Sequence, residues 1–110
     1  MSFHISHRYG GDDPDVPFSA LDSLLAELRE NPDDLEHPCV AVVHDSDWAI
    51  AVFTSGLVTL ENVDELEIEP RHLRVERPED ARQLLVDLAQ GHLDVVFAAE
   101  WLPGYGTNSA

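Results

Sequence analysis

Apolar side chains recur at helical spacing in two separate stretches of this chain. Within residues 18–30 they follow the pattern i, i+3, i+4, i+7, which predicts an amphipathic helix with one apolar stripe. The same pattern runs from Pro78 to about Gln90, where a proline and two acids favour a helix start. The stripe residues are Leu21, Leu24, Leu25 and Leu28 in the first helix, and Ala81, Leu84, Leu85 and Leu88 in the second.

Outside these helices the pattern is that of β-strands. CVAVVHD (39–45) and WAIAVFT (48–54) are apolar on both faces, as is typical of central strands, and the short polar stretch between them predicts a hairpin. GLVTLEN (56–62) begins at a Ser-Gly turn, and FHISHRY (3–9) has strand composition. ELEIE (65–69) and HLRVE (72–76) alternate cleanly and predict a further pair of strands around Pro70. Residues 92–101 favour a short helix over a closing strand.

The order strand, helix, several strands, helix predicts an α+β fold. We expect a mostly antiparallel sheet of about five strands with the two main helices packed on one face, because each helix has a single apolar stripe to cover. The other face of the sheet is then available to solvent or a partner. At 110 residues the chain is expected to be a single globular domain, 1–110, with residues 107–110 frayed.

The charge of the chain narrows the classes of partner. Twenty-two acids face six arginines and no lysine, which gives a formal charge of −16. This field repels nucleic acid and anionic membranes and attracts a basic protein or a cation, although solubility alone is an alternative explanation. No membrane span or signal peptide is recognised, so a cytoplasmic protein is expected. Cys39 lies in an apolar run, where burial is expected to raise the pKa of its thiol.

The sequence predicts no catalytic residue, metal site or cofactor. The six histidines show no ligand spacing, and His4 and His7, three apart in a predicted strand, point to opposite faces. HDSD (44–47) combines an imidazole, two carboxylates and a hydroxyl, but a tight turn between apolar strands selects the same residues. The turn is the favoured interpretation, and a small enzyme or metal protein built around HDSD is kept as an alternative.

Acidic residues are segregated along the chain. Residues 12–36 hold nine acids and one base, and residues 45–70 hold seven acids and no base. If 65–69 is a strand, its three glutamates share one face and repel one another unless positive charge lies opposite. That charge is either His72 and Arg74 of the predicted neighbouring strand or a basic partner. The expected partner-binding residues are the acids of the second region and two tryptophans: Asp45, Asp47, Trp48, Glu61, Asp64, Glu65, Glu67, Glu69 and Trp101.

The segment EWLPGYG (100–106) concentrates aromatic residues, glycine and proline near the end of the chain. Because it follows an apolar run, Trp101 is expected to close the core behind the last element, and a role as partner anchor is the second possibility. Tyr105, flanked by glycines, is expected to be exposed.

Three segments together, SHRYGG (6–11), HDSDWAIAVFTSGLVTLENVDE (44–65) and GHLDVVFAAEWLPGYG (91–106), are similar to small bacterial immunity proteins of polymorphic or contact-dependent growth-inhibition toxin systems. The resemblance spans most of the chain and rests on scattered aromatics and glycines. It implies a non-enzymatic cytoplasmic antitoxin that binds a cognate toxin domain. Many such toxins act on nucleic acid through basic clefts, so a nuclease-type toxin is the expected partner. The alternative is an acidic DNA mimic or regulatory binding module without a toxin partner.

Overall fold

The computed structural model describes residues 3–8, 11–14, 17, 19–29, 39–65 and 67–104. Within these residues, seven strands form one sheet in the order β2-β1-β3-β4-β5-β6-β7, and every neighbouring pair is antiparallel. The predicted α+β class is therefore confirmed, and short strands at both edges make the sheet wider than five strands. The strands are β1 Phe3–Ser6, β2 Asp12–Pro14, β3 Cys39–His44, β4 Trp48–Phe53, β5 Leu57–Asn62, β6 Arg71–Arg74 and β7 Leu102–Pro103.

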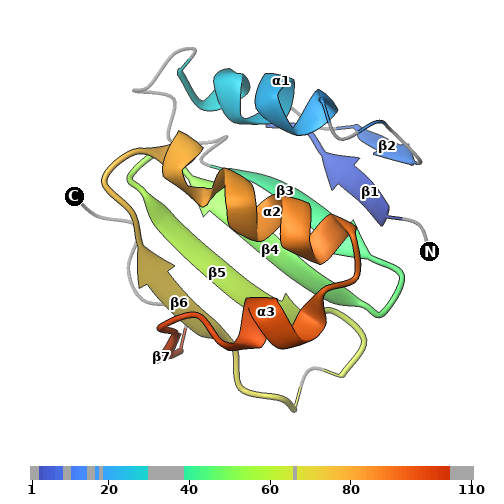
Figure 1. Cartoon of the computed structure of the whole chain (residues 1–110), viewed down its shortest axis with the longest axis vertical. Helices are drawn as coiled ribbons and strands as arrows, with labels where there is room; N and C mark the ends of the chain where they lie inside the picture. The colour runs from blue at the N-terminus through green and yellow to red at the C-terminus, as the bar shows by residue number, and fades with distance from the viewer. Residues whose placement is uncertain are drawn as a thin grey trace.

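The helices lie together on one face of this sheet (Figure 1). The first main helix is α1 (Ala20–Ala26), continued by a 3-10 turn η1 (Glu27–Arg29). The second begins with the 3-10 turn η2 (Pro78–Ala81) and continues as α2 (Arg82–Ala89). Residues 92–101 include the short helix α3 (Leu93–Phe97), so the favoured helical interpretation is confirmed. None of the helices in the described part of the chain has the length and apolar character needed to cross a bilayer.

The core forms where the two helical stripes meet alternate residues of the sheet. One row crosses four strands in register, with Ile5 opposite Val42, Val42 opposite Ile50 and Ile50 opposite Leu60. All four side chains are almost fully buried and belong to the same cluster as the helix leucines. Burying four such side chains contributes on the order of 6 to 12 kcal/mol of hydrophobic free energy. The stripe residues that join them are Leu21, Leu24, Leu25, Leu28, Ala81, Leu85 and Leu88, with Leu84 partly buried.

The prediction of a strand over 65–69 is wrong, because this stretch belongs to an irregular connection between β5 and β6. Strand β5 ends at Asn62, whose side-chain oxygen accepts the backbone N–H groups of Asp64 (3.0 Å) and Glu65 (2.8 Å). An asparagine side chain that bonds the backbone two or three residues later turns the chain out of the sheet. Ile68 N–H then bonds Glu65 O at 3.1 Å, and β6 pairs directly with β5.

Candidate functional site

One end of the sheet brings together segments that are far apart in the sequence. The β3–β4 turn (45–47) and the β5–β6 connection (63–70) leave the sheet at this end, and Val63 N–H bonds Asp47 O at 2.8 Å. Helix α3 covers the same end, because the Phe97 ring packs edge-on against Trp48 with centroids 4.9 Å apart. Strand β7 adjoins it by pairing with the first residues of β6. We call these four segments the acidic end.

The predicted partner-binding residues gather at the acidic end. Six of the seven acids have exposed side chains there. The seventh, Glu61, is the second-last residue of β5 and is partly buried. Trp48 and Trp101 are both partly buried and pack against the hydrophobic core. The exposed acids are Asp45, Asp47, Asp64, Glu65, Glu67 and Glu69. Two further exposed acids, Asp94 on α3 and Glu100 between α3 and β7, were not predicted from sequence.

Three arginines at or beside the main helices lie away from this end and contact other acids there. Across the helices, Arg82 Nε contacts Asp22 Oδ1 at 2.6 Å, and Arg29 contacts Glu79 at 3.4 Å. Arg77, before η2, contacts Asp80 at 3.6 Å. Within the described residues, no ion pair involves five of the exposed acids: Asp47, Asp64, Glu65, Glu67 and Glu69. The negative charge at the acidic end is therefore left to solvent, counter-ions or a partner.

The internal network predicted between the glutamates 65–69 and His72 and Arg74 does not form. Those glutamates lie in the connection and not in a strand beside β6. His72 uses its Nδ1–H to bond Gly104 O at 2.9 Å, which fixes the chain after β7. In the described part of the chain, these glutamates therefore have no cross-strand partner among the basic residues that follow Pro70.

Apolar side chains are exposed at the same end. Among the described residues, the large hydrophobic side chains that remain exposed are Val63 (45%), Val95 (50%) and Leu102 (57%). They lie in the β5–β6 connection, on α3 and in β7, respectively. An apolar centre within a charged rim is the usual anatomy of a protein–protein interface. The acidic end carries both kinds of exposed side chain, apolar and charged.

The turn interpretation of HDSD is confirmed. His44 is buried, and its Nδ1 accepts hydrogen bonds from the Ser46 N–H at 3.1 Å and the Ser46 hydroxyl at 2.8 Å. The imidazole therefore stabilises the turn. Asp47 has φ of 71°, a left-handed conformation that Asp tolerates better than most residues. The ring Nε2 has no hydrogen-bond partner in the described structure. Because Nδ1 serves the turn, this histidine is poorly placed to act as a base on a substrate.

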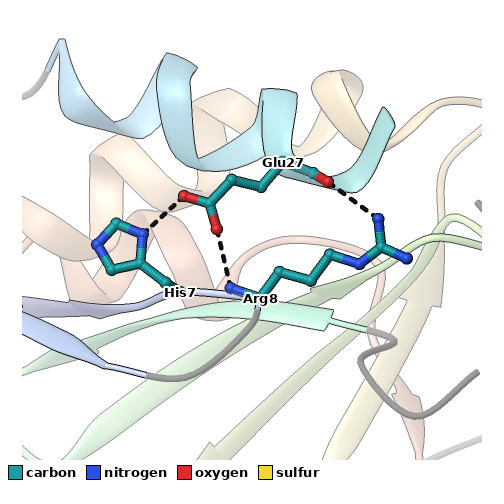
Figure 2. Close-up of polar contacts among 3 residues, drawn as sticks. All are labelled: His7, Arg8 and Glu27. Carbon is teal, nitrogen blue, oxygen red and sulfur yellow. Dashed lines mark hydrogen bonds and ion pairs between the residues drawn. The ribbon is translucent and has the colours of Figure 1, made fainter. Parts of the chain in front are cut away.

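Sequence reasoning missed a polar cluster at the opposite end of the sheet (Figure 2). Both oxygens of the Glu27 carboxylate are used: Oε2 accepts His7 Nδ1–H at 2.6 Å, and Oε1 accepts the Arg8 N–H at 2.9 Å. The buried Arg8 guanidinium in turn donates to the Glu27 carbonyl at 3.0 Å. The cluster ties β1 to the end of the first helix. Its partners are 19 and 20 residues apart, so no local pattern reveals it.

The described residues hold no group of three or more His, Cys, Asp or Glu side chains suited to a metal ion. Cys39 is half-buried, and this burial raises the pKa of its thiol, which disfavours the nucleophilic thiolate. Comparisons with models of known protein families, with characterised proteins and with solved structures found no match. The site therefore has to be interpreted from its own geometry.

Proposed function

We propose that this chain is an immunity protein that binds and neutralises a cognate toxin domain through its acidic end. The observation that supports the proposal is that seven acids and three exposed apolar side chains from separate segments lie at one end of the sheet. The partner has a basic surface of the kind that nuclease-type toxins use to hold nucleic acid. The resemblance of the sequence to small bacterial immunity proteins supports the same function, in the cytoplasm and without catalysis.

The electrostatics fit this role because the net charge is large and several exposed acids lie at the acidic end. A formal charge of −16 on 110 residues produces a field that steers a basic partner toward the protein from a distance. Steered association reaches about 10⁸ to 10⁹ M⁻¹s⁻¹ at low salt. An immunity protein has to capture its toxin before the toxin acts, so fast association has direct value. The exposed Val63, Val95 and Leu102 then supply apolar area that slows dissociation.

Co-expression with the product of the adjacent gene tests the proposed function. We expect the two proteins to co-purify and the cells to be protected from the toxin's activity. Failure of both would refute the immunity function. Co-purification of a DNA-binding protein instead would support the alternative of a DNA mimic, which uses the same acidic surface without a toxin.

A matched pair of variants then tests the acidic end itself. Glu67→Gln removes one exposed charge from the β5–β6 connection, and Glu76→Gln removes one exposed charge beyond the far end of β6. We expect Glu67→Gln to slow association with the partner about twofold to threefold at low ionic strength, with less effect at high salt. Glu76→Gln should change the rate less. Equal effects of the two variants would show that net charge matters and the acidic end does not.

A further inference from the structure

A pocket opens at the acidic end, where β6 and β7 begin to pair. Its volume is about 330 Å³, which is at the lower end of the range for ligand sites and large enough for one bulky side chain. Four of its six lining residues are apolar or aromatic. The lining residues are Glu69, Pro70, Arg71, Trp101, Leu102 and Pro103.

The walls of the pocket are fixed before any ligand arrives. The Trp101 indole N–H donates to Val96 O at 2.7 Å, which holds the ring against α3. Gly104 N–H donates to Pro70 O at 2.8 Å, and β7 pairs with β6 through Pro103 and Arg71. Two proline rings add stiffness because their φ angles are locked. A ligand therefore meets a preformed surface, and little ordering opposes its binding.

The charges in the pocket balance, although its surroundings are acidic. Glu69 contributes one negative charge to the lining and Arg71 contributes one positive charge. The Arg71 guanidinium lies 5.7 Å from the centroid of the Phe97 ring. The exposed acids Glu67, Glu100 and Asp94 lie in the neighbouring segments. A lining with one acid and one base has no net formal charge, which favours an uncharged side chain in the pocket. The acids in the neighbouring segments favour basic residues beside that side chain. An aromatic ring also gains from stacking on Trp101 and from the Arg71 cation.

We infer that this pocket is the socket for one aromatic anchor residue on a basic protein partner. The inference rests on the proposed function for its choice of a basic protein, and it adds the type of residue that the partner inserts. Leu102, which is 57% exposed while lining the pocket, becomes covered when the anchor enters. Buried aromatic anchors surrounded by weaker contacts are the usual energetic centres of protein interfaces.

Two blocked tripeptides of equal charge test this inference on the isolated protein: acetyl-Lys-Phe-Lys-amide and acetyl-Lys-Ala-Lys-amide. Both should shift the backbone NMR signals of residues 64–69, because both are cationic. Only the phenylalanine peptide should also shift the Trp101 indole N–H signal in a saturable manner, with a dissociation constant in the millimolar range expected for a single anchor (roughly −4 kcal/mol). Equal shifts of that signal by the two peptides, or no shift by the phenylalanine peptide, would overturn the inference.

Two exposed apolar residues provide a matched pair of variants. Leu102→Ala shortens a side chain that lines the pocket, and Val63→Ala shortens one that does not. We expect Leu102→Ala to raise the dissociation constant of the phenylalanine peptide about threefold to tenfold, because apolar contact area is lost. Val63→Ala should leave it within about twofold, given the small effect of contacts outside the anchor. Equal weakening by both variants would contradict an anchor at this pocket.

The inference and the proposed function can fail separately. If the adjacent gene product binds and is neutralised but the two peptides behave alike, the immunity function stands and the aromatic socket is refuted. If the phenylalanine peptide alone reaches Trp101 but no neighbouring gene product is bound, the socket stands and the immunity function is refuted.

Discussion

Gly56 occupies a position that no other residue fits, and replacing it with alanine should destabilise the protein strongly. It lies in the turn between β4 and β5 with φ of 88°, in the left-handed region that favours glycine. A Cβ at this position would lie 2.3 Å from the Val75 carbonyl oxygen. The contact cannot relax cheaply, because Gly56 O also accepts the Val75 N–H at 2.9 Å. The backbones of Gly56 and Val75 are therefore held close together, and neither can move away without weakening this hydrogen bond.

The magnitude follows from comparison with Gly11, which has φ of 89° and nothing within 4 Å of an added Cβ. The left-handed conformation costs alanine about 1 to 2 kcal/mol, and the stiffer unfolded chain offsets about 0.4 to 1 kcal/mol. Gly11→Ala should therefore lower the free energy of unfolding by about 1 kcal/mol. In Gly56→Ala, displacement of the Val75 backbone and weakening of its hydrogen bond add to this loss, and the free energy of unfolding should fall by about 3 kcal/mol in total.

Urea unfolding of both variants measures the difference directly. A domain of this size loses about 4 °C of Tm per kcal/mol, so Gly56→Ala should melt about 12 °C lower and Gly11→Ala about 4 °C lower. The turn at Gly56 lies at the opposite end of the sheet from the acidic end, so peptide binding should persist in the folded variant. Equal destabilisation by the two substitutions would refute the close approach to Val75.

Two further predictions concern residues away from the acidic end. Glu27→Ala should lower the free energy of unfolding by about 2 kcal/mol, because it removes the acceptor of the His7 and Arg8 hydrogen bonds, and Glu27→Gln should lose about half as much; indistinguishable urea midpoints for the two would contradict this. Cys39 in the folded protein should react with a disulfide reagent more slowly than in the urea-unfolded chain, because burial raises the pKa of its thiol. Since the unfolded thiol ionises first, this group should also remove stability as the pH rises above about 9, and a flat stability profile there would argue against it.

The secondary structure that depends on side-chain periodicity was largely predictable from sequence. The two leucine stripes became helices, and the apolar runs became β3 and β4, because burial requires the same spacing that the sequence shows. The stretch 65–69 has strand periodicity but is not a strand, since the Asn62 side chain turns the backbone just before it. Residue pattern alone does not reveal a hydrogen bond that ends a strand.

The acidic residues of the candidate site could be picked out from the sequence, but their position in the fold could not. Its acids were recognisable by their segregation, but their meeting at one end depends on the order of the strands in the sheet. Trp101 was expected to pack against the core, and it does so with its indole N–H bonded to Val96 O. The pocket beside it could not be foreseen, because it arises from the pairing of β6 with a two-residue strand. The expected exposure of Tyr105 and fraying of 107–110 lie outside the described residues.

Both edge strands of the sheet contain a proline: Pro14 in β2 and Pro103 in β7. Proline has no backbone N–H, so a strand added from another molecule would meet an interrupted ladder at either edge. The edge strands are also only three and two residues long, which further limits edge-to-edge pairing. Both edges of the described sheet are therefore poor templates for pairing with a strand of another molecule.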